Sequence, residues 1–435
     1  MAQPKQTPPL LGVRLSVMMF LQYAIWGAWL PLFPAFLGEH RKLTEEQVGN
    51  IGAVGALGAV IAPFIMGQIA DRWLSTEKVL GILHLAGAAL IWQLATFTDY
   101  SSLFVFALAY SMLYAPTMPL TNALAFHHLP DRDKGFGRVR LWGTIGWIAV
   151  GIGMGQWLLH YYTPAEAEAG VTAAIVRAKQ VEGMADAFRL SALLGAVMGL
   201  FCFTLPHTPP QPGKQSIAPL EALGEIRKQP LITLFLLSLP VSCLHQFFFY
   251  HAGAYLGKLQ TERTWIDGIF GVGGGGLMTI GQISEIFFLA AVPFFAKKLT
   301  RKTILTIGLV AYALRFAAFA FTFSIGVAVP ALALHGPVFG GFIFLAFLIV
   351  DEETTGDVRA SAQGLYNLVI VGVGVVVGSY LSGQTAAWVK QRYGEMNYQM
   401  LFGIPFVATL VCLGLLWAFY PGGKSRAQLA AERGA

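Results

Sequence analysis

Long apolar stretches alternate with short polar segments along the whole chain. Most stretches hold about 20 residues or more, the length an α-helix needs to cross the hydrocarbon core of a bilayer. Charged residues rarely interrupt them. The pattern predicts an all-α membrane protein with twelve spanning helices, at residues 14–37, 46–70, 79–97, 101–125, 139–160, 188–205, 231–257, 269–296, 303–323, 326–350, 360–385 and 399–420.

A polar, proline-rich stretch from His207 to Pro230 divides the predicted helices into two sets of six. Its composition is typical of a linker. We therefore expect an N-terminal half at 1–205, a cytoplasmic linker at 206–230, a C-terminal half at 231–423 and a cytoplasmic tail at 424–435. Transporters built from two such repeats bind substrate near the middle of the membrane, between the repeats.

The composition agrees with a membrane protein. Hydrophobic residues make up 55% of the chain and charged residues 12%, against about 25% charged in ordinary soluble domains. The net charge of +6 comes largely from loop Lys and Arg, so it indicates no nucleic-acid partner. Placing both termini in the cytoplasm assigns twice as many basic residues to the cytoplasmic side as to the other, as the positive-inside rule requires.

The three cysteines, Cys202, Cys243 and Cys412, lie in apolar segments without metal-ligand spacing. We interpret them as small core residues and expect no disulfide framework, metal or cofactor. The N-terminus lacks a cleavage-like small-residue motif before the first span. The first helix is therefore expected to serve as its own insertion signal.

Glu285 is the one charged residue inside the apolar run from Ile269 to Ala296. A charge near mid-bilayer costs about 2.5 to 3.5 kcal/mol on insertion scales, so acids there usually face a polar interior and mark a substrate or proton pathway. A second interpretation is a structural acid, neutral or paired with a neighbouring helix. We favour the functional interpretation.

Residues three, four or seven apart share one face of a helix. Gln282 therefore projects beside Glu285, and an amide with a carboxyl can hydrogen-bond a polyhydroxylated or heterocyclic ligand. By the same rule Arg140, Thr144 and Trp147 form a stripe with a cation, a hydroxyl and a flat ring. In the alternative interpretation, Arg140 snorkels to the cytoplasmic interface and Trp147 belongs to the interfacial aromatic belt.

Polar and aromatic residues also combine in the seventh predicted span. Gln246 with Phe249 or Tyr250 would form a face able to stack a base and bond its edge. For Tyr250 and His251 an aromatic interface belt is an equally good interpretation.

In the tenth span His335 and Phe339 lie four residues apart, and Pro337 is expected to break the helix between them. Broken helices line cavities in transporters. A lone histidine is more often structural than a proton carrier, although imidazole titrates in a suitable pH range. We interpret Arg315, in the ninth span, mainly as a structural cation with no partner that the sequence identifies.

Gly67, Asp71 and Arg72 follow the second predicted span. They match the Gly-x-x-x-Asp-Arg core of the loop motif of the major facilitator superfamily, although Leu74 stands where that motif usually has Gly. No span carries a His-x-x-x-His, Asp-rich or Ser/Lys catalytic arrangement, and no Walker loop is present. An enzyme or an ATP-driven pump is therefore not expected, whereas helix count alone leaves a non-transporting receptor open.

Six stretches, spread from the first to the eleventh span, together resemble the nucleoside:proton symporter family of the major facilitator superfamily. They are Gln22 with Trp26–Trp29, Tyr114–Thr117, Arg140–Gly146, Gln282–Glu285, Leu314–Phe316 and Arg359–Gly364. The resemblance implies a twelve-helix, monomeric transporter of the bacterial inner membrane that imports nucleosides with protons. It places around the nucleoside Arg140, Thr144, Gln246, Gln282, Glu285 and Phe339, with Trp147 in an aromatic position.

The chain departs from the family pattern at three positions. Phe249 stands where members can present Asn, and His335 stands where a Tyr can occur. Gly340 occupies the position after the aromatic that commonly holds an Asp. Any acid-based proton coupling therefore has to run through Glu285, which we expect to be protonated facing outside and to favour substrate binding in that form. The altered helices leave an uncoupled facilitator, or a carrier of a related solute such as a sugar, as the alternative.

Overall fold

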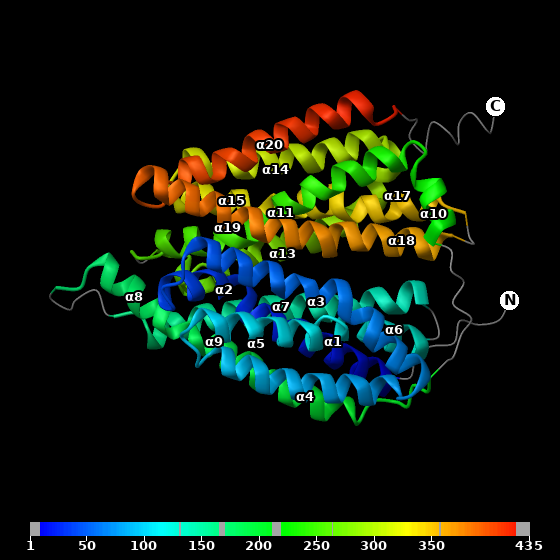
Figure 1. The fold of residues 1–435 in the computed structure, drawn as a ribbon. Coiled ribbons are helices and arrows are strands. Elements are labelled where there is room, and N and C mark those ends of the chain that lie inside the picture. The colour runs from blue at the N-terminus through cyan, green and yellow to red at the C-terminus, as the bar shows by residue number, and fades with distance from the viewer. Residues whose placement is uncertain are drawn as a thin grey trace. The chain divides into compact units, whose positions relative to one another are not determined.

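The computed structural model describes residues 9–129, 132–164, 170–210, 219–262, 264–355 and 358–422. These residues form helices joined by short connections, and none of them is in a strand (Figure 1). The chain divides into two compact units. Unit 1 comprises Met1–Lys214 and Ala252–Thr279, and unit 2 comprises Gln215–His251 and Ile280–Ala435.

Unit 1 is built from eleven elements before residue 210 and one after it, counted over the described residues. The labels η mark short 3₁₀ or π-helical stretches. The elements are α1 (Pro9–Trp29), η1 (Leu30–Leu32), α2 (Phe33–Ala35), η2 (Phe36–His40), α3 (Glu45–Arg72), α4 (Thr76–Leu94), α5 (Tyr100–Tyr114), α6 (Thr117–His128), α7 (Arg132–Tyr161), α8 (Ala173–Gly183), α9 (Ala185–Cys202) and α12 (Asp267–Phe270).

Unit 2 contains most of the later elements. They are α10 (Pro219–Ile226), α14 (Arg301–Phe321), α15 (Ile325–Ala333), α16 (His335–Val338), η3 (Phe339–Phe344), α17 (Leu345–Glu353), α18 (Arg359–Asn367), η4 (Leu368–Val373), α19 (Gly374–Tyr393) and α20 (Tyr398–Phe419). Two long helices, α11 (Leu231–Leu259) and α13 (Gly275–Lys298), contribute residues to both units.

Ten helical stretches of the described residues are long and apolar enough to cross a membrane. Two more long helices, α3 and α7, fall at the predicted second and fifth spans, and each includes side chains outside the description. The twelve stretches follow the twelve predicted segments in order. The predicted all-α polytopic fold is thereby confirmed.

The structure corrects the start of the eighth predicted span. The apolar run begins at Ile269, but α13 begins only at Gly275. Gly271, Gly273 and Gly274 have φ of 69°, 88° and 90°, a left-handed region that interrupts a right-handed helix and that glycine adopts most readily. The glycine run is therefore a turn leading into the helix.

Two other boundaries have clear local causes. Asp99 caps α5, because its carboxylate accepts from the Ser102 backbone N–H at 2.7 Å, and this fixes the split between the third and fourth spans. The predicted linker contains a short helix, α10, that its proline-rich composition did not suggest. Glu225 on α10 accepts hydrogen bonds from the backbone and hydroxyl of Thr355, which ties the helix to the end of α17.

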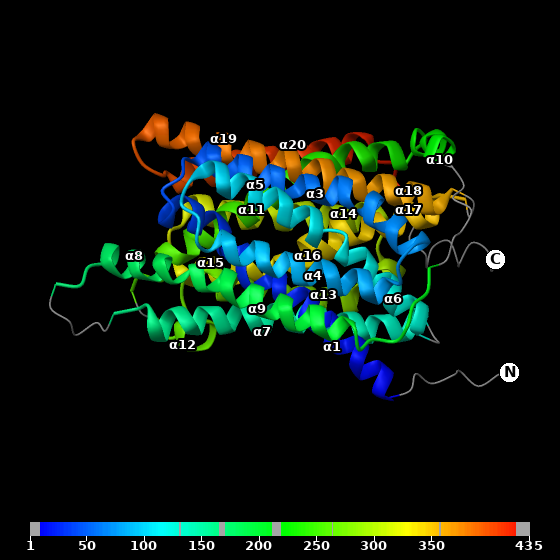
Figure 2. The same cartoon turned by 60° about the horizontal axis from the view of Figure 1, so that its bottom comes forward.

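Helices in unit 1 approach closely through small residues. The most extensive contacts are those of α1 with α7 and of α4 with α9, the latter pair visible side by side in Figure 2. A Cβ at Gly146 of α7 would lie 2.3 Å from the Phe20 carbonyl oxygen of α1. Without a hydrophobic driving force between spanning helices, such close packing is a main source of association.

A buried glutamine adds a polar contact to this bundle. The Gln22 amide N–H₂ donates to the Thr117 hydroxyl at 2.8 Å, and its oxygen lies 2.9 Å from His84 Nε2 and 3.1 Å from the Thr121 hydroxyl. Tyr114 O–H donates to the Gln22 backbone carbonyl. One side chain of α1 therefore joins α4 and α6.

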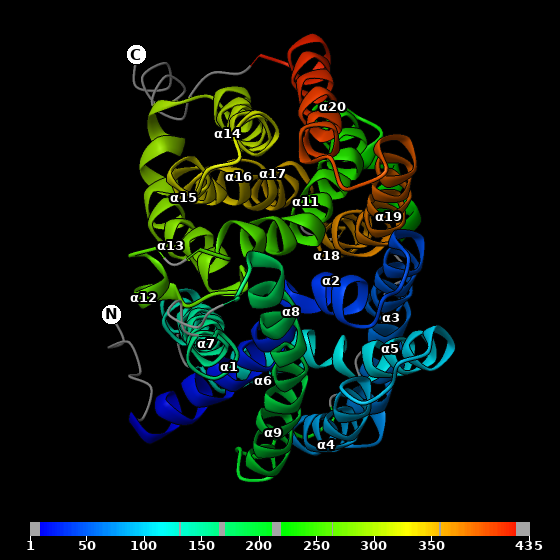
Figure 3. The same cartoon turned by 90° about the vertical axis from the view of Figure 1, so that its left-hand side faces the viewer.

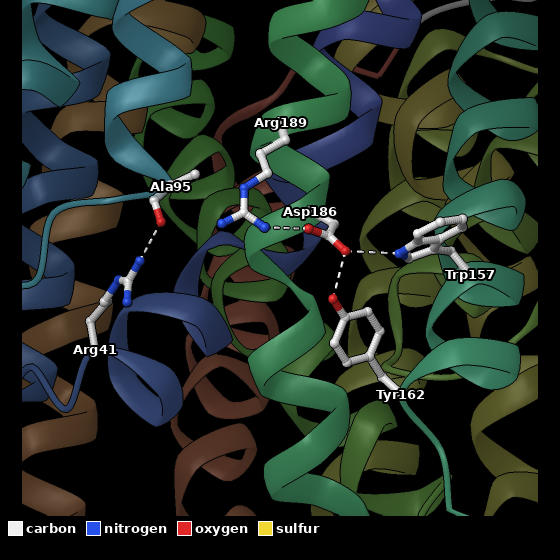
Figure 4. Close-up of polar contacts among 6 residues, drawn as sticks. All are labelled: Arg41, Ala95, Trp157, Tyr162, Asp186 and Arg189. Carbon is white, nitrogen blue, oxygen red and sulfur yellow. Dashed lines mark hydrogen bonds and ion pairs between the residues drawn. The ribbon is translucent and has the colours of Figure 1, made fainter.

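Asp186 joins α7 to α9 near the end of unit 1 that carries α8 (Figure 4). Its carboxylate accepts from Trp157 Nε1 at 2.9 Å, from Tyr162 O–H at 2.8 Å and from Arg189 Nη1 at 2.6 Å. The hydrogen bond to this carboxylate raises the pKa of the Tyr162 phenol. Beside this group Arg41 donates to the Ala95 carbonyl oxygen and connects the chain after η2 to the end of α4.

Unit 2 is organised around α14, which packs most extensively on α20. Seen end on in Figure 3, α16 lies between α14 and α13. Arg301 at the start of α14 pairs with Glu352 at 2.6 Å and also with Glu353, both on α17. These three charged residues lie at helix ends, as expected where helices leave an apolar layer.

Alanine substitutions at Gly155 and Gly153 of α7 test how strongly close backbone contact stabilises unit 1. A Cβ at Gly155 would lie 2.2 Å from the Phe270 carbonyl oxygen, whereas a Cβ at Gly153, half a turn earlier on α7, would meet no atom within 4 Å. We expect Gly155→Ala to cost about 1 to 3 kcal/mol through overpacking. Gly153→Ala should be neutral or stabilising by up to about 1 kcal/mol, because alanine loses less backbone entropy.

Thermal unfolding of the two variants in one detergent measures the difference. Equal melting temperatures for Gly153→Ala and Gly155→Ala would contradict the close contact.

Candidate substrate and proton site

Glu285 and Gln282 lie on the interior face of α13, as their spacing predicted. Gln282 is 9% exposed, whereas Phe287, on the opposite side of the helix from Glu285, is 73% exposed. The Glu285 side chain is 18% exposed. The carboxylate is therefore turned away from the lipid-facing side of its helix.

His335 on α16 is the near neighbour of Glu285 in the structure. Its Nε2 lies 3.6 Å from Glu285 Oε2, an ion-pair distance slightly longer than a hydrogen bond. Gly281 makes this approach possible, because a Cβ there would lie 2.9 Å from the His335 Cβ. The sequence predicted Gln282 as the neighbour of Glu285; the structure adds His335, fifty residues away.

Arg315 on α14 contacts the other nitrogen of the same imidazole. Its Nη1 lies 3.1 Å from His335 Nδ1, and its side chain is fully buried. The guanidinium carbon lies 3.7 Å from the centre of the Phe248 ring and 5.1 Å from that of Tyr312. Arg315 is therefore a cation held by aromatic faces beside a predicted site residue, and the partner that the sequence could not identify is His335.

Aromatic rings surround His335. Phe249 meets it edge on, with ring centres 5.8 Å apart, and Phe339 lies nearly parallel to it at 6.3 Å. His245 on α11 stacks against it at 5.5 Å, and its Nδ1 is 2.7 Å from the Tyr312 hydroxyl. The structure thus brings the predicted residues Glu285, Phe249, Phe339 and His335 together within unit 2.

Gln246 takes a different partner. Its amide N–H₂ donates to the Ser379 hydroxyl of α19 at 3.0 Å. Gly378 permits this approach, because a Cβ there would lie 3.0 Å from the Gln246 Cβ. Its predicted contact with substrate stays a prediction.

The predicted residues of α7 face α1 in unit 1. The Arg140 guanidinium carbon lies 3.9 Å above the Tyr23 ring, and the Trp147 ring meets Trp26 edge on at 5.5 Å. Arg140 and Trp147 are seven residues apart, so both contacts fall on one side of α7, a side that Thr144 shares by helical spacing. Whether this stripe binds substrate or stabilises the bundle stays a prediction.

The tenth span is irregular at and just before the predicted position. α16 contains Pro337, while a turn at Leu334 precedes it and the π-helical stretch η3 follows from Phe339. Single π-helical turns occur often at functional sites. The change from α-helical to π-helical geometry falls between Val338 and Phe339, so the helix is distorted between His335 and Phe339, as predicted, but is not interrupted there.

Gly340 explains the absence of a second acid in steric terms. A Cβ at this position would lie 2.5 Å from Phe288 Cδ1 and 3.4 Å from Leu289 Cδ2, both on α13. The side chains of α13 occupy the space that a larger residue would need.

The loop-motif residues Gly67, Asp71 and Arg72 fall on the last turns of α3, and their side chains lie outside the described residues. In the part of the chain that the structure describes, no three His, Cys, Asp or Glu side chains gather as a metal ion would require.

Sequence reasoning assigned no site role to His245 or to Arg315. The intramembrane position of Arg315 was a usable signal, because a buried arginine needs a partner. Its pairing with His335 depends on how α14 and α16 pack, and no sequence pattern gives that.

The interior carboxylate, imidazole and amide groups within a bundle of spanning helices are typical of a transporter. The fold is that of the major facilitator superfamily. A crystal structure of the nucleoside transporter NupG matches with a TM-score of 0.81 and 25% identity, covering 95% of this chain and 100% of that chain. A bacterial homologue of the human lysosomal transporter Spinster, at TM-score 0.70 and 15% identity, covers 96% and 97% and shares the fold.

The chain belongs to the nucleoside H⁺ symporter family, whose sequence model matches residues 10–422. It is 33% identical over 386 residues to the putative nucleoside transporter YegT of Escherichia coli (strain K12), which covers 85% of this chain and 83% of the relative. The nucleoside permease NupG of the same organism is 27% identical over 405 residues, which make up 90% of this chain and 91% of the permease. The xanthosine permease of the same organism is 28% identical over 425 residues, which make up 94% of this chain and 95% of that permease.

These matches confirm the predicted family and show a transporter, not an enzyme. They favour proton-coupled nucleoside import over the uncoupled or sugar-carrying alternative. The protein is accordingly a multi-pass membrane protein of a bacterial transporter family.

A double-mutant cycle tests the steric account of Gly340. We expect Gly340→Ala to lower the melting temperature in detergent, with a cost of about 1 to 3 kcal/mol, because the new methyl group meets the Phe288 ring. In a Phe288→Ala background the same change should cost little, since the obstructing ring is gone. An equal cost in both backgrounds would show that Phe288 does not exclude a side chain at position 340.

Proposed function

We propose that nucleoside binding and proton binding meet at Glu285. The observation that carries this proposal is the interior carboxylate placed beside His335, with the Phe249 and Phe339 rings near the same imidazole. A nucleoside offers a flat base, which stacks on aromatic rings, and hydrogen-bonding groups on its base edge and ribose. Gln282 and Gln246 supply amides that both donate and accept.

Arg140, Thr144 and Trp147 form the second proposed set of substrate residues. Their common side of α7 combines a cation, a hydroxyl and an aromatic ring, in line with the chemistry of a nucleoside. The Gly67, Asp71 and Arg72 motif is proposed to act in the conformational change. We also propose a monomer in the inner membrane, with both termini in the cytoplasm as the Lys and Arg distribution supports.

Protonation of Glu285 from outside would favour nucleoside binding, and release of both inside would complete import. Each positive charge moved inward gains about 2.3 kcal/mol per 100 mV. That energy corresponds to roughly fiftyfold accumulation of substrate. Coupling through one carboxylate is therefore energetically sufficient.

Glu285→Gln tests the coupling, because an amide of the same shape cannot ionise. In proteoliposomes with an imposed proton gradient, we expect this variant to lose accumulation of tritiated nucleoside. Glu395→Gln, which changes an exposed acid between α19 and α20, should accumulate it as the wild type does. Accumulation by Glu285→Gln above the equilibrium level would rule out Glu285 as the proton site.

Binding of the same nucleosides to purified Glu285→Gln separates two roles. Loss of binding at every pH identifies Glu285 as a ligand contact only. Binding that persists but no longer changes with pH identifies it as the proton carrier.

Phe339→Ala tests the proposed stacking. Removal of one ring should weaken nucleoside binding by about 1 to 3 kcal/mol, or roughly five- to hundredfold. Phe321→Ala is the matched control, since that ring is 62% exposed and lies on α14 away from His335. Competition of free ribose and of free bases against nucleoside, measured with both variants, identifies which part of the ligand Phe339 contacts. Unchanged affinity in Phe339→Ala would remove this residue from the site.

A further inference from the structure

His245 of α11 lies among the aromatic residues of the proposed substrate site. Its ring centre is 5.0 Å from that of Phe249 and 5.5 Å from that of His335. The Phe339 ring centre lies slightly farther away, at 6.5 Å. Gln246, another proposed binding residue, follows His245 directly in the chain. A side chain in this position can contact the same ligand as its neighbours, so the protonation of its two nitrogens determines what it offers to that ligand.

The Tyr312 hydroxyl of α14 determines which nitrogen of His245 accepts a hydrogen bond. Tyr312 has no exposed surface, and its hydroxyl lies 2.7 Å from His245 Nδ1. Within the described residues this imidazole is the one hydrogen-bond partner of that hydroxyl. A buried O–H without an acceptor costs free energy, so buried hydroxyls donate where they can. Tyr312 therefore donates its hydrogen to Nδ1.

With Nδ1 as the acceptor, the proton of a neutral His245 is on Nε2. A doubly protonated ring would carry N–H at Nδ1 and leave the buried Tyr312 hydrogen without an acceptor. The charge of Arg315 disfavours the imidazolium as well. Its guanidinium carbon lies 5.1 Å from the centre of the Tyr312 ring, and its Nη1 contacts His335, on which His245 stacks. His245 is therefore a neutral imidazole with its N–H at Nε2.

This N–H is accessible to a ligand. The His245 side chain is half-buried. Its Nε2 has no hydrogen-bond partner among the described residues, and it is not one of the buried polar atoms that lack a partner. The accessible part of the side chain therefore includes the donor nitrogen.

We propose that His245 is a further substrate-binding residue, whose Nε2–H donates a hydrogen bond to an acceptor on the base of the nucleoside. This rests on the proposed nucleoside site. The acceptor is a ring nitrogen or a carbonyl oxygen. The base and not the ribose is the expected partner, because the donor lies among the rings of Phe249 and Phe339, which are proposed to stack the base.

A histidine fixed as a donor makes a different demand on the ligand from the nearby amides. Gln246 and Gln282 can each present a donor or an acceptor by turning the amide group, so they tolerate either kind of group on the ligand. His245 offers only a donor. A base that presents N–H or C–H at that position forgoes one hydrogen bond, so His245 contributes selectivity among ligands of the same size and shape.

Competition binding with analogues that lack one acceptor tests this hydrogen bond. Tritiated adenosine and uridine serve as probes on purified protein in detergent, and the nucleoside that the wild type binds more tightly is the parent compound. For adenosine the analogues are deaza compounds, each with one ring nitrogen replaced by C–H. For uridine they are thio compounds, each with one carbonyl oxygen replaced by sulfur, a weaker acceptor.

In the wild type we expect one analogue to bind roughly three- to tenfold more weakly than the parent, which corresponds to the loss of one uncharged hydrogen bond. His245→Phe keeps a ring for stacking but has no N–H, so this variant should bind that analogue and the parent equally. If every analogue keeps its wild-type affinity ratio to the parent in His245→Phe, the inference is overturned.

His245→Gln separates the N–H from the ring, because an amide N–H can take the place of Nε2–H. This variant should again bind the parent more tightly than the same analogue. Loss of the preference in both variants would show that the ring is recognised and not its N–H, which contradicts the inference. Analogues without one ribose hydroxyl examine the other part of the ligand. A change in their ratio in His245→Phe, with the base analogues unaffected, would contradict the assignment to the base.

His251→Phe is the matched control on the same helix. His251 Nε2 lies 3.3 Å from the Ser382 carbonyl oxygen, and its position six residues after His245 places it on a different face of α11. This variant should keep every wild-type ratio. Loss of the same preference here would show general damage to α11 and would count against His245. If His245→Phe does not fold, His245→Leu, which also lacks a donor, decides by the same ratio.

The outcome for the proposed function is read separately. A wild type that binds and accumulates nucleoside, with unchanged ratios in His245→Phe, refutes only the role of His245. A wild type that binds neither adenosine nor uridine and accumulates neither refutes the proposed nucleoside site and this inference with it.

Discussion

A carboxylate inside the membrane-spanning part of a protein has to be stabilised by hydrogen-bond donors or neutralised by a proton. The interior of unit 2 is arranged around that constraint. Glu285 has an imidazole beside it, the imidazole has a guanidinium, and the guanidinium lies on aromatic faces. Each polar group reduces the cost of burying the next. Gly281 lets α16 come close enough for this sequence of contacts.

The helices were predictable because each is dictated by a local property. Backbone polar groups in hydrocarbon must bond within their own helix, so an apolar run of sufficient length leaves the chain little choice. Gln282 with Glu285, and Arg140 with Thr144 and Trp147, followed from helical periodicity in the same way. The contacts of Arg315, His335 and His245 could not be predicted in this way. Three different helices supply these residues, and periodicity does not indicate which helices are in contact.

Irregular backbone was the other feature that the pattern of apolar and polar residues did not predict. The apolar sequence from Ile269 onward predicts a helix, but three glycines with positive φ precede α13, which begins only at Gly275. Pro337 indicated a distortion but not its form, which is a π-helical stretch that follows α16 and packs against α14.

The glutamine network of unit 1 has a consequence for how this protein can evolve. Codons for Gln and Glu differ by one base, so Gln22 is a single nucleotide away from becoming a second buried acid beside a histidine, His84. The Thr117 hydroxyl stands in the way: it donates to the Tyr114 carbonyl and accepts from the Gln22 amide. A carboxylate at position 22 would bring two acceptors together, and the hydroxyl could donate to it only by giving up its hydrogen bond to the Tyr114 carbonyl.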